Sequence, residues 1–179
     1  LWIDCIIDHE PEHRLVAIKN ISLAEEYLHD YLVDGKPVMP FSLMIEGMAQ
    51  TAGILVGSIS KFKEKVILAK ITRATLDKDC TAGDTIRFEA NVERIDQGGA
   101  STTGTVDRRV AGGDAWERVG EVELMFSHID NNMGGIEFPD YNFVFSDNFK
   151  MILETPLETP EIGLKNFQRG ESQWFFNTK

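Results

Sequence analysis

Hydrophobic and polar residues alternate loosely in two stretches near the start of the chain. The first is LWIDCIIDHE, residues 1–10, and the second is HRLVAIKNISL, residues 13–23. Alternation with a period of two, together with β-branched residues such as Val16 and Ile18, indicates strands. The Glu10-Pro11 pair lies between the stretches and favours a turn. The pattern therefore predicts two strands joined by a turn.

The next apolar stretch does not alternate. Residues 41–60, FSLMIEGMAQTAGILVGSIS, are apolar nearly all round, contain no proline and follow Pro40. Proline is favoured at the first position of a helix, and a helix that is apolar on every side is buried. We therefore expect a long central helix over about residues 40–58. Its small residues would let another backbone approach closely; they are Gly47, Ala49, Ala52, Gly53 and Gly57.

Four strand-like runs follow this helix. They are VILAKITRATL, DKDCTAGDTIRFEANVERID, STTGTVDRRVAG and AWERVGEVELMFSHI, which end at residues 76, 96, 112 and 129. The sequences AGD, QGGA and AGGD between the strand-like parts are typical of turns. One buried helix with strands on both sides of it in sequence predicts an α+β fold, in which an antiparallel sheet wraps around a central helix.

The composition changes after residue 129. Gly, Pro, Asn and Asp are mixed with aromatic residues, and no period is sustained. We therefore predict two parts: a domain over residues 1–129 and an irregular C-terminal extension over residues 130–179 that packs on it. The extension is expected to lay six aromatic residues on a surface: Phe138, Tyr141, Phe143, Phe145, Phe149 and Trp174.

Charge and cysteine content narrow the expected partners. The formal net charge of −11 disfavours nucleic acid and anionic membranes, because phosphate neutralisation needs clustered Lys and Arg. No run of about 18 apolar residues is present, so no membrane span is expected. Cys5 and Cys80 lack metal-ligand spacing and are too few for a disulfide framework, which favours a reducing compartment, the cytoplasm. Neither a metal nor a cofactor is expected.

Two segments carry a family resemblance. The run IDCIIDHEPEHRLVAIKNISLAEEYLHDYLVDGKPVMPFSLMIEGMAQ, residues 3–50, and the run LAKITRATLDKDCTAGDTIRFEANVE, residues 68–93, resemble the hot-dog-fold 3-hydroxyacyl-[acyl-carrier-protein] dehydratases of the FabZ type. The elements PVMP, Glu46, AQ and AGD occur in the family's order. The resemblance implies a hot-dog fold and a homodimer or higher homo-oligomer. It also implies an acyl tunnel at the dimer interface, which holds a thioester of acyl-carrier protein or coenzyme A.

The resemblance also implies a catalytic pair. In the family a His removes the α-proton, and an acid on the central helix of the opposite subunit handles the departing hydroxyl. Glu46 falls on the acid position, and we expect it to face an apolar cavity, where desolvation keeps a carboxyl protonated. A backbone amide at the helix start polarises the thioester carbonyl. The substrate-binding residues expected there are Pro40, Phe41, Ser42, Leu43 and Gln50.

The motif His is missing from this chain. When the motif is aligned from its N-terminal side, the position of the His falls on Tyr31. When it is aligned backward from Pro37, that position falls on Leu32. One residue has therefore been inserted between Tyr31 and Pro37, where LVDGK replaces the family's FPGx. If residues 29–31 are extended, His29 lies on the same face as Tyr31, about 7 Å away. His29 and Tyr31 are therefore the candidates for the base, or, for Tyr31, for a hydrogen-bond donor to the thioester.

Three functions stay open. The first is a dehydratase with Glu46 as acid and a displaced base. The second is a hot-dog thioesterase, in which the carboxylate of Glu46 suffices. The third is a non-catalytic acyl-binding subunit, one half of a heterodimer.

Acyl-carrier protein is itself acidic, so this acidic chain would need a local basic patch to bind it. The candidates for that patch are Lys19, Lys36, Lys61, Lys63, Lys65, Lys70 and Arg73.

Overall fold

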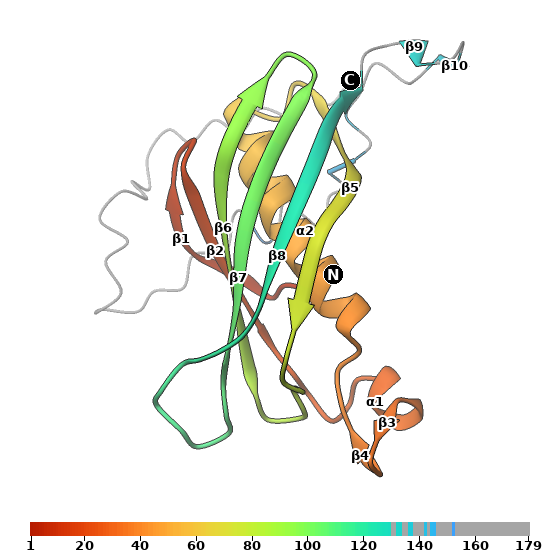
Figure 1. Ribbon diagram of the computed structural model, residues 1–179, viewed down its shortest axis with the longest axis vertical. Coiled ribbons are helices and arrows are strands. Elements are labelled where there is room, and N and C mark those ends of the chain that lie inside the picture. Colours follow the sequence, from red (N-terminus) through yellow and green to blue (C-terminus); the bar gives the residue numbers. More distant parts are fainter. Residues whose placement is uncertain (130–131, 134–135, 138–141, 143, 146–151, 153–179) are drawn as a thin grey trace.

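The computed structural model describes residues 1–129, 132–133, 136–137, 142, 144–145 and 152 (Figure 1). The division at residue 129 stays a prediction, because most of the expected extension lies outside these residues. Of its six aromatic residues only Phe145 is described. The short strands β9 (Asn132–Met133) and β10 (Ile136–Glu137) pair with each other.

Six strands form one antiparallel sheet, in the expected chain order of two strands, a helix and four strands. The sheet order is β1-β2-β6-β7-β8-β5, and the sheet curves around helix α2 (Figure 1). The α+β prediction is confirmed. The elements are β1 (Cys5–Glu10), β2 (Arg14–Asn20), α2 (Phe41–Ile59), β5 (Lys65–Leu76), β6 (Thr85–Asp96), β7 (Gly99–Arg109) and β8 (Glu117–Ile129).

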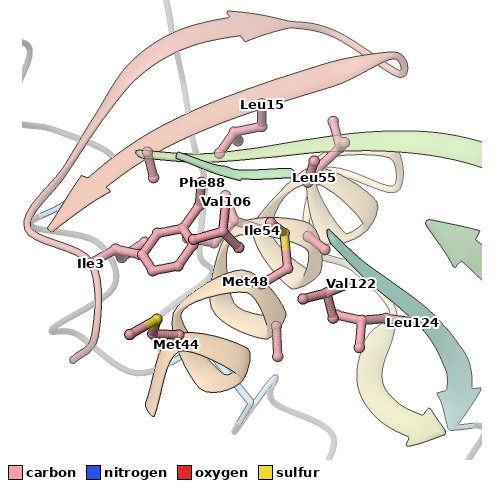
Figure 2. Packing of buried hydrophobic residues seen from close by; sticks show 14 of the residues in the cluster. Ile3, Leu15, Met44, Met48, Ile54, Leu55, Phe88, Val106, Val122 and Leu124 are labelled. Atoms are coloured by element: carbon pink, nitrogen blue, oxygen red, sulfur yellow. The ribbon is translucent and has the colours of Figure 1, made fainter. Parts of the chain in front are cut away.

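The core lies between helix α2 and the sheet. Two glycines allow the helix to approach the strands. A Cβ atom at Gly47 would lie 2.5 Å from Cζ of Phe88 on β6, and one at Gly104 on β7 would overlap Met48. By length and composition α2 is apolar enough to cross a membrane, but most of it is buried as a core helix. Figure 2 labels ten of the packed side chains: Ile3, Leu15, Met44, Met48, Ile54, Leu55, Phe88, Val106, Val122 and Leu124.

Strand β5 is an edge strand with an uncovered apolar face. Its residues Leu68, Ile71 and Ala74 pair with Phe126, Leu124 and Val122 of β8 and therefore share their helix-facing side. These three residues are three positions apart rather than two, because β-bulges between Leu68 and Lys70 and between Ile71 and Arg73 each add one residue to the strand. In the single chain Leu68 is 37% exposed and Ile71 46% exposed. This face is apolar but open to solvent.

The outer face of the sheet is polar and carries an ion triad. Asp107 on β7 is buried and accepts hydrogen bonds from Arg87 at 2.8 Å and Arg118 at 2.6 Å. Burial raises the pKa of Asp107, but the hydrogen bonds and charges of Arg118 and Arg87 outweigh it, so the pKa lies below its ordinary value. The triad ties β6, β7 and β8 together.

The segment between β2 and α2 contains elements that hydrophobic periodicity does not reveal. Helix α1 (Tyr27–Asp30) makes one turn, and β3 (Leu32–Val33) pairs with β4 (Lys36–Pro37). The turn residues Asp34 and Gly35 have φ of 50° and 74°. Positive φ at both central residues is the geometry of a type I′ hairpin, for which Asp-Gly is a favoured pair.

Candidate active site

Glu46 lies in the second turn of α2, one turn beyond Ser42. The expectation that it faces an apolar cavity is wrong for the single chain, because its side chain is exposed to solvent. The surrounding α2 residues are apolar, and Met44 and Met48 are buried, but Glu46 lies in the first part of the helix, where Phe41 and Ser42 are also exposed. Among the described residues Glu46 makes no ion pair with Lys or Arg.

A neighbouring amide fixes the Glu46 side chain. Gln50, one helical turn later, donates a hydrogen bond from Nε2 to Oε1 of Glu46 at 2.9 Å. The backbone N–H of Trp2 donates to Oε1 of Gln50, also at 2.9 Å. Residues four apart share one face of a helix, so Ser42, Glu46 and Gln50 form a polar stripe on an otherwise apolar helix. Trp2 was not among the residues expected at the site.

The first backbone donors of α2 have no partner within the described residues. Pro40 is the N-cap, and no described side chain caps the helix. The N–H groups of Phe41 and Ser42 therefore lack intrahelical acceptors, and both residues are exposed. Leu43 is half-buried, and Phe41 is 41% exposed. Such a terminus is suited to a carbonyl oxygen or an anion.

The loop between β5 and β6 holds the chain that leads into α2. Thr81 donates a hydrogen bond from its hydroxyl to the carbonyl of Pro37 at 2.6 Å. The backbone N–H of Met39 donates to the carbonyl of Cys80 at 2.8 Å. These bonds fix the direction in which the helix starts, and so the direction of its free N–H groups.

The structure does not bring His29 to Glu46. The assumption of an extended segment is wrong, because His29 lies within helix α1, where residues two apart point about 200° apart. His29 is exposed, and its Nε2 lies 3.2 Å from the carbonyl oxygen of Leu23. Tyr31 follows the helix in an extended conformation and is 45% exposed. Both residues stand at the surface of the single chain.

The other histidines lie elsewhere in the fold. His9 is on β1, where burial lowers its pKa and favours the neutral ring. His13 is in the β1–β2 turn, and Nδ1 of His128 lies 3.3 Å from Glu64, beyond the far end of α2. Among the described residues no cluster of His, Cys, Asp or Glu is arranged to hold a metal.

The expected basic patch is not formed. Lys19 is buried and paired with Glu25 at 2.7 Å and Asp4 at 3.2 Å. Lys65 is also buried, and Arg73 pairs with Glu121 and Glu123. The exposed lysines of this set are spread over the fold: Lys36 lies on the hairpin before α2, Lys61 and Lys63 follow the helix, and Lys70 lies on β5.

Comparisons with known proteins identify relatives of the whole domain. A sequence model of the FabA-like domain matches residues 1–116. The 3-hydroxyacyl-[acyl-carrier-protein] dehydratase FabZ of Acetivibrio thermocellus is 32% identical over 135 residues, which cover 74% of this chain and 86% of that protein. The FabZ of Pelotomaculum thermopropionicum is 33% identical over 129 residues, covering 71% and 86%.

Solved structures give the same fold at low sequence identity. The dehydratase heterocomplex ApeI:P from Xenorhabdus doucetiae matches with a TM-score of 0.57 and 15% identity over 73% of this chain and 84% of that chain. An acyl-CoA hydrolase from Staphylococcus aureus, in complex with butyryl coenzyme A, matches with a TM-score of 0.52 and 12% identity over 66% of each chain. With the FabZ relatives, these matches confirm the hot-dog fold. The chain therefore belongs to the FabA-like family and is a homologue of the FabZ dehydratases.

Proposed function

We propose that this protein binds 3-hydroxyacyl thioesters between two subunits and eliminates water from them, with Glu46 as the acid. The observation that carries the proposal is the fixed carboxyl group on α2. By the sequence resemblance Glu46 falls on the family's acid position. Its Oε1 accepts a hydrogen bond from Gln50, and no described Lys or Arg forms an ion pair with it. Such a group is free to exchange a proton with a ligand.

The reaction needs two proton transfers. A base takes the α-proton, the Cα–H electrons form the C=C bond, and the C3 hydroxyl leaves as water with a proton from Glu46. In this proposal the N–H groups of Phe41 and Ser42 stabilise the negative charge on the thioester oxygen. His29 and Tyr31 remain the candidate bases of this chain. Because the loop that carries the family's His is rebuilt as the β3–β4 hairpin, we expect dehydration to be weak.

A homodimer formed along β5 would complete the site. The two sheet edges differ: β1 is short and carries Asp8 and Glu10, whereas β5 is twelve residues long with apolar Leu68 and Ile71 on its open inner face. Charged residues protect an edge from further pairing, and an open apolar edge favours it. A second copy on β5 would cover this face and exclude water near Glu46.

A thioesterase is the second candidate. Its supporting observation is that Glu46 has no histidine partner within the described part of the chain, and hydrolysis by an activated water needs only the carboxylate. A subunit that binds acyl groups without its own chemistry, or that supplies Glu46 to a different hot-dog subunit, is the remaining alternative.

Coenzyme A and acyl-carrier protein both remain possible carriers of the acyl group. The cytoplasm remains the proposed compartment, supported by the buried free thiols of Cys5 and Cys80.

One assay separates these candidates. The protein is incubated with 3-hydroxyacyl and saturated acyl thioesters of several lengths while enoyl absorbance and free thiol are followed together. A rise in enoyl absorbance supports the dehydratase. Release of free thiol without enoyl product would contradict the dehydratase and support the thioesterase. Thioester binding without either product would support the non-catalytic acyl-binding subunit.

A further inference from the structure

The hydrogen bonds around Gln50 determine the orientation of its amide group. A backbone N–H only donates, so the amide atom that faces Trp2 must be the acceptor Oε1. The donor Nε2 then faces Oε1 of Glu46 at 2.9 Å. The flipped amide would set two donors against each other at Trp2 and two acceptors at Glu46. Both contacts therefore require the same orientation.

The backbone at Trp2 is itself fixed on several sides. Ile3 is 1% exposed in the core, and the N–H of Asp4 donates to β2 at 2.7 Å. The Trp2 ring packs edge-on against Tyr27, with 5.4 Å between the ring centroids. A Cβ at position 47 would lie 3.0 Å from the carbonyl oxygen of Trp2, so Gly47 is what allows the N-terminal segment to pass so close to α2.

We infer that Gln50, held by the backbone N–H of Trp2, is a positioning residue that orients the Glu46 carboxyl group for catalysis. The inference rests on the proposed function and assigns Gln50 a role other than contact with the substrate. With Oε1 of Glu46 occupied, Oε2 is the oxygen left to exchange a proton with the thioester. A glutamate has several rotatable bonds, and fixing it before the substrate arrives removes an entropic cost from the reaction.

The test is a double-mutant cycle on turnover. Gln50→Met keeps the side-chain length but removes both amide contacts. We expect kcat to fall about 10- to 100-fold while KM changes less than about twofold, because the acid is misplaced but substrate contacts remain. In a Glu46→Gln background the same Gln50→Met change should have no further effect on kcat. Gln97→Met, in the exposed turn between β6 and β7, is the matched control and should leave both constants unchanged.

Two kinetic results would overturn the inference. A rise in KM at unchanged kcat would make Gln50 a substrate contact, and losses that multiply in the double mutant would show that it acts independently of Glu46. If the wild type turns over no thioester, the proposed function fails, and hydrogen exchange of the Trp2 amide still tests whether Trp2 holds Gln50. Exchange that is slow in the wild type and fast in Gln50→Met supports the hydrogen bond between Trp2 and Gln50, whereas equal exchange contradicts it.

Discussion

Two glycines on helix α2 form a matched pair for testing how closely the helix approaches the sheet. A Cβ at Gly47 would lie 2.5 Å from Cζ and 2.7 Å from Cε2 of Phe88. A Cβ at Gly53 would lie 3.6 Å from the nearest atom, Cε1 of Phe126, which is ordinary contact. The same Gly→Ala change therefore meets a clash at one position and ordinary van der Waals contact at the other.

The magnitudes follow from two opposing effects. Alanine in a helix interior is favoured over glycine by about 0.8–1 kcal/mol. Overpacking a filled core costs about 1–3 kcal/mol, and Phe88 is fully buried, so its ring cannot move aside. We therefore expect Gly53→Ala to raise the free energy of unfolding by up to about 1 kcal/mol and Gly47→Ala to lower it by about 1 kcal/mol.

Urea unfolding followed by circular dichroism measures both changes, at one protein concentration so that any association contributes equally. For a chain of 179 residues each kcal/mol corresponds to about 2–4 °C in Tm, so the two variants should differ by roughly 4–8 °C. Gly47→Ala should also weaken the contact between Trp2 and Gln50. Equal stabilisation by both substitutions would refute the close packing of α2 on Phe88.

Three further predictions concern association, pH and the rebuilt loop. Ile71→Asp places a charge on the apolar face of β5 and should yield a folded monomer in analytical ultracentrifugation, whereas an unchanged dimer would place the interface elsewhere. The ionised Asp107 stabilises the fold above its unfolded pKa of 3.8, and this contribution is lost as the pH falls through the lower folded value. Unfolding free energies measured below about pH 4 should therefore decline less steeply in Asp107→Asn than in the wild type, and parallel curves would contradict this assignment. Replacing residues 31–36, YLVDGK, by HFPGK together with Phe41→Gly should restore far more dehydratase turnover than Tyr31→His alone, because the hairpin changes the geometry as well as the residue type. Equal recovery by the single change would contradict this expectation.

The main elements of the fold were readable from the sequence because each has a simple pattern. Alternation marked β1 and β2, and the all-round apolar run with Pro40 before it marked α2. The hairpin between Leu32 and Pro37 was missed although Asp34-Gly35 is its signal, because each of its strands is only two residues long. The sequence also did not reveal that β5 is an edge strand with an apolar inner face. Its bulges place the inward-facing residues three positions apart, so the strand lacks the usual alternation.

The site was only partly readable from the sequence. Glu46 and the start of α2 follow from the family motif, but the contact between Trp2 and Gln50 joins residues 48 positions apart and depends on where the N-terminal segment crosses the helix. The placement of His29 was misjudged because a single turn of helix replaces an extended segment. Glu46 is exposed in the single chain, and its burial by a second subunit belongs to the proposal, because the pattern within one chain does not specify a dimer.

The central claim is that Glu46 exchanges a proton with an acyl thioester. The most direct measurement compares wild type with Glu46→Gln in the assay that follows enoyl absorbance and free thiol together, with thioester binding measured in parallel. Since general acid–base catalysis contributes about 100- to 10,000-fold, we predict a loss of turnover of at least about 100-fold with binding retained. Turnover that persists unchanged in Glu46→Gln would contradict the account.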